Sequence, residues 1–133
     1  MKRRAIHVVL AAALSASALA QEENSPEAMA VVKPGEVVRF DRDSIRDFGQ
    51  KRSFEIAIVW GDSGAPKPAG FLSRRVRYVA DCSAATLGIA SVAVYDATGM
   101  LLKSMISPPG AVDPATPAAG SAEARWLKDV CNS

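Results

Sequence analysis

The chain has 133 residues, of which 49% are hydrophobic, and its 16 basic and 14 acidic side chains give a formal net charge of +2. This length suits one domain with a modest core. Because the charges nearly balance, the composition gives no indication of nucleic acid or of an anionic membrane as a partner.

The first 20 residues are predicted to be a signal peptide. Three basic residues at positions 2–4 precede an apolar stretch over residues 5–14, and Ala18-Leu19-Ala20 follows with the small residues that signal peptidase recognises. The apolar stretch is shorter than the roughly 20 residues that a membrane anchor needs. No cysteine stands near the cleavage site to accept a lipid. We therefore expect an exported product, periplasmic or secreted, without a transmembrane segment or a lipid anchor.

Cleavage after Ala20 would change the chemistry of the chain. Three basic residues would be lost, so 13 basic residues would face 14 acidic ones and the net charge would become −1. His7, the one histidine of the chain, would be lost as well. Without an imidazole base or ligand, no catalytic set, metal or cofactor is expected.

Periodicity divides the remaining residues into a leader and one domain. Residues 21–35 are polar and without a sustained period, which predicts a flexible leader before a domain over residues 36–133. Residues 41–49 carry turn-forming side chains and are expected to form a bend or one helical turn. Apolar runs and alternating apolar side chains predict strands over Val37–Phe40, Ser53–Trp60, Phe71–Ala80, Thr86–Tyr95 and Met100–Ile106.

Short connections between these strands favour antiparallel pairing. Asp96-Ala97-Thr98-Gly99 is typical of a hairpin turn. In Thr86–Tyr95, Gly88, Ala90, Val92 and Val94 alternate with Leu87, Ile89 and Ala93, which suits a central strand that a helix approaches closely. Pro108–Gly120 contains four prolines and two glycines, so it cannot lie inside a sheet and is expected to cross over one face.

An amphipathic helix is predicted over Ser121–Cys131, with Ser121 as its N-cap. At about 100° per residue, one arc of this helix is apolar and consists of Ala122, Trp126, Leu127 and Val130. Two cysteines in an oxidising compartment usually pair, so a Cys82–Cys131 disulfide should hold this helix against the sheet. The predicted fold is α+β: an antiparallel sheet of four to six strands with a C-terminal helix packed on one face.

One segment has the form of a catalytic motif. Gly61-Asp62-Ser63-Gly64 matches the nucleophile segment of trypsin-like serine proteases. Those enzymes need a histidine base and about twice this chain length. We interpret the segment as a turn, and a small serine hydrolase using Ser63 stays as an alternative.

Two basic clusters have both a binding and a structural interpretation. They are Lys51-Arg52 and Arg74-Arg75 with Arg77. If adjacent strands bring them together, they would hold an anionic sugar or an acidic protein surface. A solvated strand face, or an edge kept from self-pairing, is the other interpretation.

Aromatic and acidic residues leave two further alternatives open. Trp60 and Trp126 fit the apolar patterns of a strand and a helix, which favours core packing over a role as binding anchors. Asp41, Asp43 and Asp47 have part of the spacing of a calcium loop. They lack the central glycine and the bidentate glutamate of such a loop.

Several short motifs, taken in order, resemble the surface-adhesin protein E family of Gram-negative bacteria. The matching pieces are Phe40-Asp41 with Ser44-Ile45-Arg46, Trp60 at a strand end, Asp81-Cys82 after a strand, Tyr95-Asp96 with Gly99, and Val130-Cys131. The resemblance covers about residues 37–131 and implies an antiparallel sheet with a C-terminal helix held by a disulfide. The family's namesake is a surface lipoprotein that binds host matrix and plasma proteins. This chain differs in lacking a lipidation cysteine and a tryptophan before the final helix.

These observations predict a non-enzymatic, exported binding or adhesin-like module. Its partner would be a protein or the extracellular matrix and not nucleic acid, and a homodimer is allowed. The contact surface is expected on the sheet face that the helix leaves open, including Arg75 and Arg77. The alternative is a periplasmic structural or inhibitory protein that acts on another envelope component.

Overall fold

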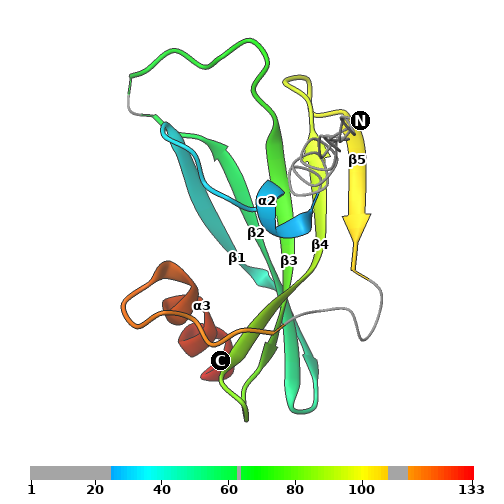
Figure 1. Cartoon of the computed structure of the whole chain (residues 1–133), viewed down its shortest axis with the longest axis vertical. Coiled ribbons are helices and arrows are strands. Elements are labelled where there is room, and N and C mark those ends of the chain that lie inside the picture. Colours follow the sequence, from blue (N-terminus) through cyan, green and yellow to red (C-terminus); the bar gives the residue numbers. More distant parts are fainter. Residues whose placement is uncertain (1–24, 63, 108–113) are drawn as a thin grey trace, which may run out of the picture.

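Five strands pair in chain order to form one antiparallel sheet, β1-β2-β3-β4-β5 (Figure 1). The computed structural model describes residues 25–62, 64–107 and 114–133. Its strands are β1 (Glu36–Phe48), β2 (Lys51–Trp60), β3 (Ser73–Asp81), β4 (Thr86–Tyr95) and β5 (Leu101–Ile106), and its helices are α2 (Pro26–Met29) and α3 (Ala122–Cys131). The predicted α+β class, with its antiparallel sheet and C-terminal helix, is confirmed.

Both helices lie on the same face of the sheet, near opposite ends of its strands (Figure 1). Met29 and Ala30, at the end of α2, pack against the buried cluster of strand side chains, as do Trp126 and Leu127 of α3. The opposite face carries no helix in the part of the chain that the structure describes. The two faces are termed the helix face and the open face.

The core forms on the helix face because alternate residues of the central strands are apolar. Phe54, Ile56 and Ile58 of β2 are at most 1% exposed. Burial of each such side chain contributes roughly 1.5–3 kcal/mol. Trp126 of α3 completes the cluster, with its ring centroid 5.7 Å from that of Tyr78.

A β-bulge lets both halves of β4 contribute to this core. Arg77 pairs with Ser91, whereas the next residue, Tyr78, pairs with Ile89, so Ala90 is the extra residue. The apolar residues on either side of the bulge therefore share the helix face, and they are Leu87, Ile89, Val92 and Val94. Strict alternation would place Leu87 and Ile89 on one face and Val92 and Val94 on the other. This prediction is wrong because the bulge shifts the period by one residue.

Residues 41–49 do not form the expected bend or helical turn, because most of them belong to β1. The pairing with β2 shifts between Asp41 and Arg46, where four residues of β1 lie opposite one of β2. The turn-forming side chains act inside the strand: Ser44 Oγ accepts a hydrogen bond from the Glu55 amide at 2.7 Å and donates one to the Asp41 carbonyl at 2.6 Å. A side chain thus replaces part of the backbone ladder, and the strand bulges instead of ending.

Part of the expected leader has regular structure. Pro26–Met29 forms α2, and Ser25 Oγ caps it by accepting a hydrogen bond from the Ala28 amide at 3.1 Å. This differs from the flexible leader expected for the segment, because Met29 packs against the core. A helix of four residues is too short to be recognised from the periodicity of its apolar residues. Residues 21–24 and the predicted signal peptide lie outside the described residues.

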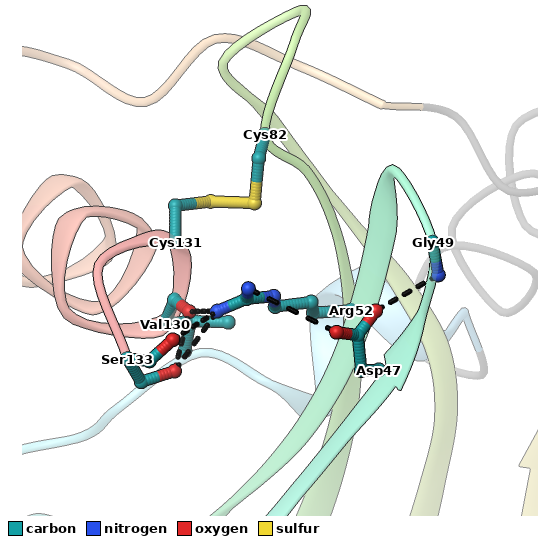
Figure 2. A network of polar contacts seen from close by, with 7 residues as sticks. All are labelled: Asp47, Gly49, Arg52, Cys82, Val130, Cys131 and Ser133. Atoms are coloured by element: carbon teal, nitrogen blue, oxygen red, sulfur yellow. Dashed lines mark hydrogen bonds and ion pairs between the residues drawn. A yellow bond between two sulfur atoms is a disulfide. The ribbon is translucent and has the colours of Figure 1, made fainter.

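A disulfide and an arginine hold α3 on the helix face (Figure 2). Cys82, in the turn after β3, is bonded to Cys131, and their Cα atoms are 5.6 Å apart, which confirms the expected pairing. Arg52 of β2 donates from Nη1 to the main-chain oxygens of Val130 at 2.6 Å and Ser133 at 2.8 Å. These oxygens lie at the negative end of the helix dipole, where a cation is stabilising.

Trp60, at the end of β2, packs in a second aromatic cluster. Its ring contacts Phe71 edge to face, with centroids 5.5 Å apart, and its Nε1 donates to the Ala65 carbonyl at 3.0 Å. Gly35 lies against the same ring, since a Cβ added there would overlap its atoms. Gly35 also has φ of +87°, so glycine meets both demands of this position.

Replacing Gly35 with alanine should lower the free energy of unfolding by roughly 2–4 kcal/mol, because the added methyl group meets Trp60 and the positive φ disfavours alanine. Gly49→Ala is the matched control, since Gly49 has φ of +82° but nothing within 4 Å of an added Cβ. The control should lose only about 1 kcal/mol. Urea unfolding measures both, and equal losses would show that the Trp60 contact is unimportant.

The Cys82–Cys131 bridge joins residues 49 positions apart. In the chain-entropy model, closing a loop of this length stabilises the fold by about 4 kcal/mol. Cys82→Ala/Cys131→Ala should therefore lower the free energy of unfolding by about this amount, and the tryptophan emission, to which Trp60 and Trp126 both contribute, should shift to the red as α3 loosens. Reduction of the wild type should reproduce both effects; an unchanged unfolding midpoint in both samples would contradict the role given to the bridge.

Candidate binding surface

The centre of the open face carries a charged cluster made of Glu55 on β2 and Arg75 and Arg77 on β3. Arg77 Nη2 lies 2.6 Å from Glu55 Oε1, and Arg75 Nη1 lies 3.9 Å from Glu55 Oε2. The side chains of Arg75 and Arg77 are 61% and 53% exposed. Exposed pairs of this kind add little stability. One carboxylate orients two guanidinium groups and leaves one positive charge of the cluster uncompensated.

Two hollows flank the charged cluster. The first, of about 370 Å³, lies over β1 and β2 and includes Arg39; the second, of about 490 Å³, extends over β4 toward β5. Glu55 and Arg75 line both hollows and so separate them. Small side chains line much of the second hollow, including Ala90, Ser91, Ala93 and Ser104. The open face is therefore a charged ridge between two depressions.

The structure places Arg75 and Arg77 on the open face, as expected, because period-2 alternation along β3 directs both to the side away from the helices. Their role in binding stays a prediction. Glu55 is a member of the cluster that the sequence did not single out. It is the one acidic residue in the strand Ser53–Trp60, but its partners depend on register, which composition does not reveal.

Arg74 does not belong to this surface. It lies on the helix face with its side chain 5% exposed, and it forms a bidentate pair with Glu36 of β1 at 2.8 and 2.9 Å. It also donates to the main-chain oxygens of Val31 at 3.0 Å and Leu72 at 3.3 Å. A basic cluster containing Arg74 is therefore wrong, because alternation puts neighbouring residues of a strand on opposite faces.

The Arg74–Glu36 pair ties β1 and the segment after α2 to β3. Burial would raise the pKa of Glu36, but the hydrogen bonds from Arg74 and from the Lys33 amide, with the positive charge of Arg74, outweigh it and lower the pKa below its ordinary value. The Glu36 side chain is 3% exposed. A pair buried this deeply requires both partners, because either charge alone would stay desolvated and uncompensated.

The two basic clusters do not join into one surface. Arg52 points to the helix face, where it holds the end of α3 and lies 3.9 Å from Asp47 Oδ2 (Figure 2). Lys51 pairs with Asp81, whereas Arg75 pairs with Ala57, six residues further along β2. An anion site built from both clusters is therefore wrong, and the exposed arginines of β3 remain as the candidate.

The tryptophans have different environments. Trp126 packs against the core, which confirms the structural interpretation. Trp60 belongs to the aromatic cluster with Phe71 and is partly exposed, and it lines a hollow of about 310 Å³ on the helix face together with Arg74. Core packing is thus confirmed for one of the two residues.

Nothing in the described residues forms a metal centre: no group of three or more histidine, cysteine or acidic residues converges there. Asp41 accepts a hydrogen bond from the Asp43 amide at 3.0 Å, and Asp47 accepts one from the Gly49 amide at 2.8 Å. These carboxylates therefore organise the bulge of β1 and the following turn. The catalytic alternative falls on Ser63, which lies outside the described residues.

Three other groups with shifted pKa values lie away from the charged cluster. Burial raises the pKa of Tyr78 to about 12, so its hydroxyl stays protonated in the core at physiological pH. The Ala84 amide lowers the pKa of Asp81, and the Thr98 hydroxyl lowers the pKa of Asp96. Both carboxylates accept hydrogen bonds within the turns that follow β3 and β4.

The family model for surface-adhesin protein E matches residues 27–132, which include all five strands, α3 and both cysteines. The chain belongs to the surface-adhesin protein E family. Membership indicates an adhesin-like protein of the cell surface or exterior and favours a non-enzymatic role. Neither the curated proteins nor the solved structures gave a match. In the described residues of this family member, no helix has the length and apolar character needed to cross a membrane.

Glu36→Gln should lower the free energy of unfolding by roughly 3 kcal/mol at neutral pH, because glutamine cannot neutralise the buried Arg74. Since the pKa of Glu36 is lowered in the fold, its carboxylate stabilises the protein above the ordinary value of 4.5 and this contribution is lost as pH falls through the folded value. The difference between wild type and variant should therefore shrink on acidification.

Chemical unfolding over a series of pH values from neutral to about pH 3 measures this difference. Glu27→Gln is the control, because Glu27 is an exposed carboxylate on α2. Its effect should be small at every pH. A Glu36→Gln effect that is constant across the series would show that the ionised pair is not what stabilises this end of the sheet.

Proposed function

We propose that this member of the surface-adhesin protein E family is an exported, non-enzymatic binding module of the bacterial envelope, which engages a protein or matrix partner through its open face. The observation that carries the proposal is the charged ridge at the centre of the sheet face that the described helices leave uncovered. Arg75 and Arg77 share one carboxylate there and remain more than half exposed. The family match supports the same class of function.

The chemistry of the ridge suits an acidic protein surface. Guanidinium groups bind carboxylates through paired hydrogen bonds, and a partner carboxylate would supply the charge that Glu55 alone does not balance. The hollows on both sides allow partner side chains to descend beside the ridge, over the small residues Ala57 and Ala93. Charge would thus orient the partner, and the hollows would provide contact area.

Export supports the same proposal. A disulfide that holds the C-terminal helix is typical of an oxidising compartment, and the predicted signal peptide would direct the chain there. We place the product in the periplasm or outside the cell. A structural or inhibitory role toward a periplasmic envelope component is the alternative, and it would use the same surface.

Arg75→Glu/Arg77→Glu should weaken binding by at least about tenfold, because it reverses both charges that would face an acidic partner. The probes are immobilised matrix and plasma proteins, and separately a periplasmic extract captured by cross-linking. Arg125→Glu/Lys128→Glu is the matched control, since it makes the same charge change on exposed positions of α3. The control should bind as the wild type does, and circular dichroism should show that both variants are folded.

The outcomes separate the interpretations. Loss of binding in the open-face variant alone, with matrix or plasma proteins as ligands, supports the adhesin-like role. The same selective loss with periplasmic proteins alone supports the alternative. Equal behaviour of the two variants would remove the charged ridge as the binding surface.

A further inference from the structure

A hollow of about 250 Å³ lies on the helix face between α2 and α3. It is lined by Tyr78 of β3, by Leu87, Gly88 and Ile89 of β4, by Glu27 of α2, by Glu123 of α3, and by Ala115 and Pro117 of the segment before α3. This volume is below the roughly 300–1,000 Å³ of most small-molecule sites. The hollow therefore suits one amino-acid side chain or a group of that size.

The fold fixes the walls of this hollow. Ala115 exchanges two backbone hydrogen bonds with Leu87, at 3.0 and 2.9 Å, which attach the segment before α3 to β4. Cys131 ties α3 to the turn after β3, and Met29 packs the end of α2 on the core. The hollow is therefore formed before a ligand arrives, and binding requires little ordering of the protein.

The Tyr78 side chain supplies an unpaired polar group at the hollow. Its ring stacks on Phe54, with centroids 5.4 Å apart, and contacts Trp126. Only 7% of Tyr78 is exposed, yet its hydroxyl has no hydrogen-bond partner among the residues that the structure describes. A buried tyrosine hydroxyl usually has such a partner. This one is free to bond a group that enters the hollow.

Two carboxylates at the same hollow are uncompensated. Glu27 and Glu123 are exposed, and neither forms an ion pair or a hydrogen bond within the described parts of the chain. Each lies in the first turn of its helix, where the helix dipole favours a negative charge. The dipole accounts for each carboxylate separately, but not for their meeting at a hollow with an unpaired hydroxyl. A cation placed there would offset the charge of both.

The polar groups of the hollow are all hydrogen-bond acceptors at physiological pH. Burial, and then the negative charge of Glu123, raise the pKa of Tyr78 to about 12, so its hydroxyl is neutral and keeps oxygen lone pairs that can accept. Carboxylates only accept. The matching ligand is therefore a positively charged donor. Because Leu87, Ile89 and Pro117 are apolar, that donor should be carried on an aliphatic stem.

We propose that this hollow, termed the lysine hollow, receives a lysine side chain of a partner protein. An ammonium group has three N–H donors, and the hollow offers acceptors from three elements, namely α2, α3 and β3. The methylene stem of lysine would pack against the apolar lining. Arginine is less suited, because its planar group is best matched by one carboxylate that accepts two parallel hydrogen bonds.

The lysine hollow goes beyond the proposed function and does not rest on it. It lies on the helix face, whereas the charged ridge lies on the open face. The two surfaces also select opposite charges, since the ridge suits acidic groups and the lysine hollow suits a basic one. Binding at either surface can therefore be measured without the other.

Small peptides test the site directly. The probe is acetyl-Gly-Lys-Gly-amide, and the same peptide with norleucine in place of lysine is its uncharged control. Titration followed by protein NMR should give a dissociation constant on the order of 1 mM for the lysine peptide. The amide signals of Leu87, Ile89 and Ala115 should shift, and that of Ala93 on the open face should not. The norleucine peptide should bind at least about tenfold more weakly.

Two variants identify the groups that bind. Glu27→Gln/Glu123→Gln keeps the shape of both side chains and removes their charge, so it should weaken binding of the lysine peptide at least about tenfold. Tyr78→Phe should weaken it roughly threefold to tenfold and leave the unfolding midpoint unchanged, because the hydroxyl bonds no described residue. Asp43→Asn/Asp62→Asn is the matched control, since it removes two exposed carboxylates that do not line the hollow. The control should bind as the wild type does.

Several outcomes would overturn the proposal. They are equal binding of the lysine and norleucine peptides, equal loss in the glutamate variant and the control, and unchanged binding by Tyr78→Phe. Tighter binding of pentylamine than of the lysine peptide would assign the hollow to a free amine instead of a protein. Equal binding of the arginine peptide would refute the selection of lysine.

Failure of the proposed function is distinguishable from failure of the lysine hollow. Arg75→Glu/Arg77→Glu should bind the lysine peptide as the wild type does. A protein that binds this peptide but none of the matrix, plasma or periplasmic probes refutes the proposed function and leaves the lysine hollow intact. A protein that binds those probes through the charged ridge but not the lysine peptide refutes the lysine hollow alone.

Discussion

The attachment of α3 to one side of the sheet is the constraint on which the rest of the structure depends. A sheet with one apolar face is stable only when another element covers that face. Here a covalent bond from Cys82 and the hydrogen bonds of Arg52 hold a short helix in place, and Val130 of this helix is fully buried in the core. The opposite face is left as a broad surface that the described elements do not cover.

Four arginines of this small sheet have three different roles, although they look alike in the sequence. Arg52 stabilises the negative end of a helix, and Arg74 forms a buried ion pair with Glu36. Arg75 and Arg77 remain exposed around Glu55. Alternation along β3 puts Arg75 and Arg77 on the opposite face from Arg74. Arg52 lies on β2 and points to the helix face, so it is also apart from Arg75 and Arg77. The candidate binding surface is therefore smaller and more defined than the total basic charge indicates.

The same alternation links the open face to the edge at β5. In the regular part of β5, the residues whose side chains face the open face direct their backbone groups away from β4, so the larger hollow reaches the outer edge of the described sheet.

Local periodicity was sufficient for much of this architecture. The strands Ser53–Trp60 and Thr86–Tyr95 and the final helix were predicted with bounds equal or close to those observed, since each depends mainly on how its own residues alternate. The disulfide followed from there being two cysteines. The prediction for residues 41–49 was wrong because Ser44 uses its turn-forming side chain to pair with Glu55, a partner 11 residues away.

The sequence by itself determined the fold class, the pairing of the cysteines and the exposure of Arg75 and Arg77, because these depend on residue type and on spacing within one element. Only the tertiary structure decided that Ala90 forms a bulge, that Glu36 neutralises Arg74, and that Glu55 stands between the two exposed arginines. Each of these depends on register between strands, and a shift of one residue in register moves a side chain to the other face of the sheet.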